Sequence, residues 1–155
     1  GTGQASSSLE IIGNVYGYAT TSTDLNYIVF TVGNTAGGTP IDITQMLVTY
    51  VCGEVSEVIT YDSGNSVVGS GSAVEPGDVG IADSKWTVIQ TYNDVGGDVN
   101  HLLEPGEQFV LAVKLPEDKP TNNVRFAVNL HPAVGAVYPI ERTVPPYLNT
   151  VNILT

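Results

Sequence analysis

Residues 107–115, EQFVLAVKL, indicate the fold class because their apolar side chains recur at every second position. The apolar set is Phe109, Leu111, Val113 and Leu115. A period of two is the signature of a half-buried β-strand, whose successive side chains point to opposite faces. Residues 124–131 repeat the pattern. We therefore predict two antiparallel strands whose apolar faces point into one core.

The same signature extends over the rest of the chain, and no segment shows a convincing helical period. Further strands are expected at residues 25–32, 43–52, 55–61, 85–92 and 148–154. The segment 25–32 is apolar on both faces, which predicts a central position in the sheet. We expect an all-β fold, a sandwich or barrel of about eight to ten short antiparallel strands.

Two Pro-Gly pairs predict tight turns between strands. They stand at the centres of Glu75–Asp78 and Glu104–Glu107. Proline fixes φ near −65° and glycine accepts a positive φ, as a type II turn requires. The length of 155 residues suits one domain. We expect a polar lead-in over residues 1–8 and a single β-domain over residues 9–155.

The charge balance excludes several classes of partner. Sixteen acidic residues face five basic ones, for a formal net charge of −11. Such a chain repels phosphate groups, so we expect no nucleic-acid partner and no polybasic membrane contact. The acidity is explained either by a solvated surface or by a surface that collects divalent cations. One cysteine, Cys52, excludes an internal disulfide.

No catalytic constellation is present in the sequence. There is no G-x-S-x-G elbow, no phosphate-binding G-x-x-x-x-G-K loop and no set of zinc ligands. The two histidines, His101 and His131, are far apart in sequence, and nothing singles out a pair of carboxylates. We predict that the protein is not an enzyme and takes no small-molecule substrate. There is also no N-x-[ST] glycosylation sequon.

Residues 92–101, YNDVGGDVNH, form the segment with the most distinctive chemistry. Asn93, Asp94, Asp98 and Asn100 surround a Gly-Gly pair. Hard cations such as Ca²⁺ take six to eight oxygen ligands from carboxylates, amides and carbonyls. The same residues are also ordinary turn formers whose side chains cap their own backbone. A cation site and a simple turn both fit, with Asp62 and Asp83 as distant candidate ligands.

Several stretches resemble the archaellins, the filament subunits of the archaeal swimming organelle. They occur in the order found in that family: ASSSLEIIGNVYGY at 5–18, LNYIVFTVGN at 25–34, DIT at 42–44, LEPGEQF at 103–109 and IERTVP at 140–145. The first stretch is similar to the junction at which the apolar N-terminal helix of an archaellin enters its β-domain. Each motif is degenerate, but the series is fairly specific.

The resemblance implies an immunoglobulin-like β-domain that packs with copies of itself in a helical filament outside the archaeal cell. It implies that this chain, which lacks the apolar helix, begins at the helix–domain junction. Membrane contact would then occur only before assembly, through that helix. Some archaellins hold a metal in the globular domain, which favours a divalent cation, with Ca²⁺ expected, at Asn93, Asp94, Asp98 and Asn100.

Two other functions remain open at this point. One is an immunoglobulin-like stator or anchoring protein of the same motility apparatus. The other is a surface-binding module of the cell envelope, in which exposed aromatic rings would stack against a ligand. The candidate rings for such a platform are Tyr16, Tyr18, Trp86 and Tyr92.

Overall fold

The computed structural model describes residues 8–67, 75–93 and 100–155, which form eleven β-strands and three short 3₁₀ turns. The strands are β1 (Leu9–Tyr18), β2 (Tyr27–Asn34), β3 (Ile41–Asp42), β4 (Leu47–Cys52), β5 (Val55–Tyr61), β6 (Lys85–Tyr92), β7 (Leu102–Leu103), β8 (Gln108–Lys114), β9 (Arg125–His131), β10 (Tyr138–Thr143) and β11 (Val151–Leu154). The 3₁₀ turns are η1 (Ile43–Gln45), η2 (Ser63–Asn65) and η3 (Pro76–Asp78).

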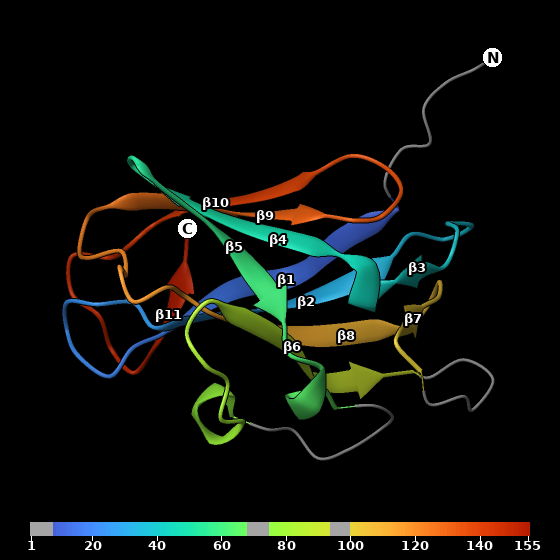
Figure 1. Ribbon diagram of the computed structural model, residues 1–155, viewed down its shortest axis with the longest axis horizontal. Helices are drawn as coiled ribbons and strands as arrows, with labels where there is room; N and C mark the ends of the chain where they lie inside the picture. The colour runs from blue at the N-terminus through green and yellow to red at the C-terminus, as the bar shows by residue number, and fades with distance from the viewer. Residues whose placement is uncertain (1–7, 68–74, 94–99) are drawn as a thin grey trace.

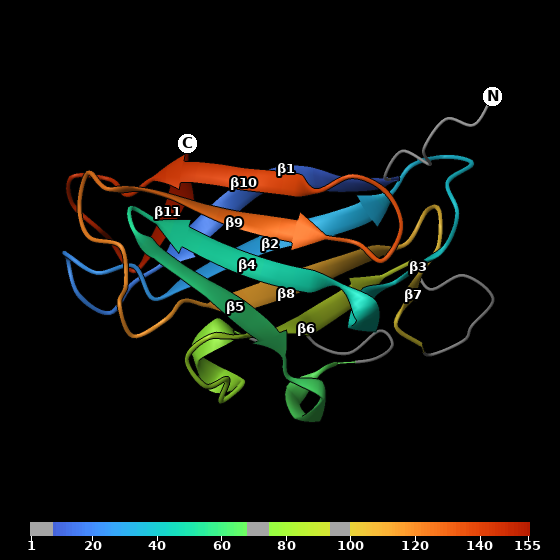
Figure 2. The ribbon, with the colours of Figure 1, turned by 45° about the horizontal axis from the view of Figure 1, so that its top comes forward.

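Nine strands form one sheet in the order β10-β9-β4-β5-β6-β8-β2-β1-β11, and β3 pairs with β7. The sheet folds over so that β10, β9, β4 and β5 lie as one layer across β1, β2, β8 and β6 (Figures 1 and 2). Its edge strands approach each other where the Thr143 amide donates to the Thr155 carbonyl at 3.4 Å. The predicted all-β fold is thus confirmed as a nearly closed sheet.

The core lies between the two layers and collects the apolar faces of both. Its largest fully buried side chains include Trp86, Tyr50, Phe30 and Phe109. Strand β8 alternates as expected, with Phe109, Leu111 and Val113 buried in this core. Strand β2 is buried on both faces and lies between β8 and β1, which confirms its central position.

A second, smaller apolar cluster covers the outer face of the β2–β8–β6 region. Val29, Ile81, Ile89 and Ala112 are buried there. Ile81 belongs to the segment that follows η3, so the connection between β5 and β6 covers this face of the sheet. Strand β2 therefore has an apolar cover on each side, which explains why its sequence does not alternate.

Two sequence predictions differ from the structure. The expected strand 43–52 is split, because Ile43–Gln45 forms the turn η1 before β4 begins. The Asp42 carboxylate causes the break by accepting hydrogen bonds from the Thr44 amide at 3.0 Å and its hydroxyl at 2.6 Å. The prediction of a type II turn at Glu75–Asp78 is also wrong. These residues form the 3₁₀ turn η3, and Gly77 has no positive φ.

The second predicted Pro-Gly turn has the expected geometry. Gly106 has a φ of 91°, and the Glu107 amide donates to the Glu104 carbonyl at 3.0 Å. A side chain at position 106 would be strained in this conformation, so the glycine is required there. The Glu107 carboxylate closes the turn by accepting from the Glu104 amide at 2.7 Å.

The direction of the strands gives the molecule two distinct ends. Strands β1, β4, β8 and β10 finish at one end, where β2, β5, β6, β9 and β11 begin. This end carries the segment 144–150 and is called the Tyr147 end. The opposite end carries β3, β7 and the segments 35–40 and 132–137, and is called the hollow end (Figure 1).

Candidate functional site

The predicted cation loop follows β6 at the hollow end, and only its flanks are described. Asp94 and Asp98 lie outside the described residues. Asn93 directly follows β6 with a φ of 59°, a left-handed conformation that asparagine tolerates. The Asn100 Oδ1 accepts a hydrogen bond from the Leu102 amide at 2.9 Å. Asn100 therefore caps its own turn, as the alternative interpretation of this segment predicts.

His101 connects the base of this loop to two other segments by hydrogen bonds. Its Nε2 lies 2.9 Å from the Ser66 hydroxyl, and its carbonyl accepts from the Ile43 amide at 3.0 Å. Its ring meets the Tyr61 ring edge-on, with centroids 6.2 Å apart. The Tyr61 hydroxyl and the Trp86 indole N–H are buried without a partner among the described residues. His101 thus has a structural role, because it holds three segments together.

The two distant candidate ligands lie in different places. Asp62 follows β5 and lies beside the start of β6, where its amide donates to the Trp86 carbonyl at 2.8 Å. Its carboxylate caps η2 by accepting from Gly64 at 3.2 Å and Asn65 at 2.6 Å. Asp83 precedes β6 and pairs with Lys114 at 3.5 Å. The eight residues of β6 separate Asp83 from Asn93 by about 26 Å. Asp83 is therefore too far away to share a cation with Asn93.

Within residues 8–67, 75–93 and 100–155, no group of three His, Cys, Asp or Glu side chains could hold a metal ion. His131, the other histidine, places its Nε2 3.2 Å from the Thr49 hydroxyl on the neighbouring strand β4. A cation site in the 93–100 loop would therefore need Asp94 or Asp98.

Among the same described residues, no helix is long and apolar enough to cross a membrane.

Burial raises the pKa of two tyrosines. Desolvation is the main cause for Tyr18, with smaller contributions from Glu75 and Tyr16. Desolvation also raises the pKa of Tyr50 well above its ordinary value, and a hydrogen bond with Cys52 adds to the shift. Both phenols consequently stay protonated at neutral pH. Tyr50 also donates to the Asp118 carbonyl at 3.5 Å, which suits a core residue.

The aromatic platform considered from the sequence does not form. Trp86 is fully buried, with its ring 4.7 Å from the Tyr61 ring in the core. Tyr16 is 37% exposed on β1, where it pairs with Val29 of β2 and Ile153 of the edge strand β11, whereas Tyr92 ends β6. These rings therefore do not share one surface. Tyr16 and Tyr18 lie two residues apart on β1, away from Tyr92 at the end of β6 and from the buried Trp86.

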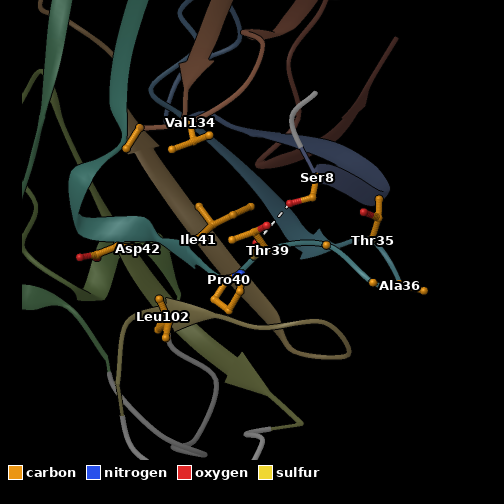
Figure 3. A pocket seen from close by; sticks show the side chains of 12 residues that line it. Ser8, Thr35, Ala36, Thr39, Pro40, Ile41, Asp42, Leu102 and Val134 are labelled. Carbon is orange, nitrogen blue, oxygen red and sulfur yellow. Dashed lines mark hydrogen bonds between the residues drawn. The ribbon is translucent and has the colours of Figure 1, made fainter. Parts of the chain in front are cut away.

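A hollow of about 570 Å³ opens at the hollow end (Figure 3). Ile41 forms part of its lining from β3, Leu102 from β7 and Val134 from the β9–β10 connection. Ser8 closes one side, where its hydroxyl donates to the Thr39 carbonyl at 3.4 Å. No sequence pattern predicts this hollow, because its lining residues come from distant parts of the chain.

Hydrogen bonds below the hollow fix its shape. The Asn34 side-chain amide donates to the Thr39 carbonyl at 2.8 Å and to the Leu103 carbonyl at 3.0 Å. Asn34 is buried, so these bonds tie the 35–40 segment to β7. A Cβ atom at Gly38 would overlap both Asn34 and Ser8, so only glycine fits at this position. The hollow is therefore a preformed feature.

The segment 144–150, at the other end of the molecule, projects a single aromatic ring. Val144 and Leu148 are buried, while Tyr147 between them is 66% exposed. The Leu148 amide donates to the Ser22 carbonyl at 3.0 Å, and the Asn122 side chain donates to the Pro145 carbonyl at 3.1 Å. This ring was also missed from the sequence. Its signal is an aromatic residue directly after two prolines in an uncharged segment.

Comparison with solved structures shows which known proteins share this fold. The likeness covers 94% of this chain and 95% of archaeal flagellin FlaB1 from Methanocaldococcus jannaschii, with a TM-score of 0.73 and 24% identity. It covers 97% of this chain and 73% of a chain in the archaeal flagellum of Methanospirillum hungatei, with a TM-score of 0.65 and 19% identity. At these identities the likeness concerns the fold, which is that of an archaellum β-domain.

A weaker likeness of fold relates the chain to a periplasmic stator complex. The complex is FlaF and FlaG from Sulfolobus acidocaldarius, with a TM-score of 0.53 and 16% identity. The match covers 90% of this chain and 92% of that chain. The β-domain of this protein is thus closer in shape to the flagellin than to the stator.

The sequence comparisons define the family more narrowly. The archaeal-type flagellin family model matches residues 1–142. The chain is 26% identical over 161 residues to probable flagellin 1 of Archaeoglobus fulgidus, across 99% of this chain and 73% of that protein. The chain belongs to the archaeal-type flagellin family, as the sequence motifs predicted.

Proposed function

We propose that this chain is a structural subunit of the archaeal motility filament and acts by assembling with copies of itself. The observation that carries the proposal is the family match over residues 1–142, together with a β-domain of the flagellin shape. The family is a structural one, so the proposed role needs no catalytic group. The protein would then work outside the cell, as part of a cell-surface appendage.

The proposal is tested on filaments sheared from the organism that carries the gene. Mass spectrometry of the purified filaments should find peptides from residues 9–155, and antibodies against this domain should decorate the filaments along their length. An in-frame deletion should remove or shorten the filaments, and the wild-type gene should restore them. Recovery of the protein only in the cell-envelope fraction would instead favour the stator or anchoring role.

Contact with the membrane belongs to the stage before assembly in this proposal. An apolar N-terminal helix of the archaellin type would make that contact and would later enter the filament core. The β-domain would remain outside the core and meet neighbouring β-domains. Neither nucleic acid nor a small-molecule substrate has a place in this function, which agrees with the net charge of −11.

We also propose that the 93–100 loop binds a divalent cation, Ca²⁺ in preference to others. The support is chemical: Asn93, Asp94, Asp98 and Asn100 are closely spaced oxygen donors in a glycine-containing loop. The hollow end also lacks a lysine or arginine to neutralise these carboxylates, because all five basic residues lie at the Tyr147 end. A bound cation would reduce repulsion between neighbouring copies.

The cation proposal predicts a melting temperature that depends on Ca²⁺. Metal-free protein should melt lower, and Ca²⁺ at about 100 times its Kd should add about 2.7 kcal/mol, or roughly 5–10 °C. The double variant Asp94→Asn, Asp98→Asn should lose this response. The matched control, Glu117→Gln with Asp118→Asn, makes the same charge change at the Tyr147 end and should keep it. An unchanged melting temperature on adding Ca²⁺ to metal-free protein would refute the site.

A further inference from the structure

A filament subunit needs a contact that joins two different surfaces. A two-fold contact, in which the same patch meets itself, closes into a dimer, whereas a head-to-tail contact that does not close a ring extends into an open filament. The two surfaces must then be complementary and must point in different directions. The Tyr147 end and the hollow end are opposite ends of this sheet, so they meet the directional requirement.

The shapes of the two ends are complementary. Tyr147 projects from a segment whose backbone is held by the buried Val144 and Leu148, so its exposed ring has a fixed point of attachment. The hollow has a volume of about 570 Å³, within the range of pockets that enclose small organic groups. Exposed tyrosines that fill pockets are typical anchors of protein interfaces. One ring on one copy thus matches one hollow on the next.

The rim of the hollow is apolar where the ring would enter. Val134 is 69% exposed, and Pro40 is also exposed beside the buried Ile41. No charged residue occurs in the segment 144–150, and Asp42 is the one charged residue among those that line the hollow. The Asp42 carboxylate already caps η1. Two chains of net charge −11 can therefore approach at these surfaces without bringing carboxylates together.

The basic residues of the chain are gathered at one end of the molecule. Every lysine and arginine of the chain lies at the Tyr147 end, at the start of β6 and β9, at the end of β8 and β10, or in the β8–β9 connection. These residues are Lys85, Lys114, Lys119, Arg125 and Arg142. The hollow end carries Glu10, Asp42 and Glu104 without a basic residue. The Tyr147 end also carries Asp24, Glu54, Asp83, Glu117, Asp118 and Glu141. The case for the contact therefore rests on shape and on the uncharged segment 144–150, and not on charge attraction between the ends.

We propose that Tyr147 of one copy inserts into the hollow between Ile41, Leu102 and Val134 of a second copy, as a head-to-tail contact between β-domains. The proposal rests on the proposed filament function and specifies which surfaces meet. A rival surface is the apolar edge formed by Tyr16, Val151 and Ile153 on β1 and β11, all exposed. That edge would give a side-by-side contact.

Cross-linking of the 155-residue chain tests the contact, at about 1 mM to match the effective concentration of linked neighbours. In a Cys52→Ala background, Asn149→Cys places a thiol beside Tyr147 and Ala36→Cys places one at the hollow. A short bismaleimide should convert the double-cysteine chain into a ladder of trimers and longer oligomers. Each single-cysteine chain should give at most traces of dimer, because a head-to-tail contact does not bring identical positions together.

Substitutions in the double-cysteine chain identify the groups responsible. Tyr147→Ala and Val134→Asp should each reduce the ladder about tenfold or more. The controls are Tyr16→Ala, an exposed tyrosine at the rival edge, and Val58→Asp, an exposed valine on β5; both should leave the ladder unchanged. Circular dichroism melts of every variant should match the background chain, which separates loss of contact from loss of fold.

Each of the following results would overturn the contact: a ladder that survives Tyr147→Ala, a ladder lost with Tyr16→Ala, or single-cysteine chains that dimerise as readily as the double-cysteine chain forms its ladder. Absence of any ladder would also overturn it. If the chain is nevertheless present in native filaments, the filament function stands and only this contact fails. If the chain is absent from filaments, the function itself fails.

Discussion

At the scale of the residue, a glycine in the first strand is packed closely against the main core. A Cβ atom at Gly17 would lie 2.7 Å from the Leu25 Cδ1 and 2.9 Å from the Leu154 Cδ2. Leu25 and Leu154 are both buried in the main core. The glycine therefore lets β1 approach two core leucines that come from distant parts of the chain.

Gly17→Ala should destabilise the protein by about 1–3 kcal/mol, because the added methyl group overpacks this contact. Urea unfolding followed by circular dichroism measures the change. Gly77→Ala is the matched control, since Gly77 has no positive φ and a Cβ there would meet no atom within 4 Å. Equal stabilities for the two variants would show that β1 can move away from Leu25 and Leu154.

At the scale of the element, the seam between β5 and β6 is the weakest pairing of the sheet. The two strands are parallel and pair only at Thr60↔Lys85 and Tyr61↔Trp86, whereas β6 and β8 pair along their whole length. Two polar contacts reinforce the seam. The Thr87 hydroxyl donates to the Asp62 carbonyl at 2.8 Å, and the Lys85 ammonium donates to the Thr60 hydroxyl at 2.9 Å.

Thr87→Val should cost about 1–2 kcal/mol, because it removes a buried hydrogen bond and leaves the Asp62 carbonyl without that donor. Hydrogen exchange should also become faster at the amides of Thr60 and Asp62, which bond across the seam to Ser84 and Trp86. Thr31→Val, the same substitution on the half-buried face of β2, should change neither quantity. Unchanged exchange in Thr87→Val would mean that the backbone bonds alone hold the seam.

At the scale of the whole molecule, charge opposes compaction and association. The net charge is −11, and only two salt bridges, Lys114–Asp83 and Arg125–Glu141, occur among the described residues. The second pair is well exposed on both sides, so its contribution to stability is small. Repulsion between carboxylates therefore acts over the whole surface and depends on the Debye length.

Raising NaCl from about 0.01 M to about 0.15 M shortens the Debye length from about 30 Å to about 8 Å. We expect the melting temperature of metal-free protein to rise by about 2–4 °C, since a gain of about 1 kcal/mol has this effect at this size. The triple variant Glu54→Gln, Glu117→Gln, Asp118→Asn should start higher and gain less. A melting temperature that does not respond to NaCl in either protein would contradict net repulsion.

The sequence by itself determined much of the local structure. Strict alternation predicted β8 and β9, apolar residues on both faces predicted the central place of β2, and the Pro-Gly pair before Gln108 predicted the turn at Gly106. Strand β1 was not predicted because Gly13, Gly17 and a shift of register between Ile12 and Tyr16 interrupt its pattern. The 43–52 segment was misassigned because a local carboxylate, Asp42, competes with the strand.

The sequence also determined the family and the acidity, because motifs and charge need no folding to be seen. Only the tertiary structure decided which residues act together. The order of strands in the sheet brings segments 35–40 and 132–137 to one end and segment 144–150 to the other. It therefore creates the hollow, isolates Tyr147 and collects all five basic residues at one end. The physical reason is that strand direction, which no local pattern specifies, sets which connections become neighbours.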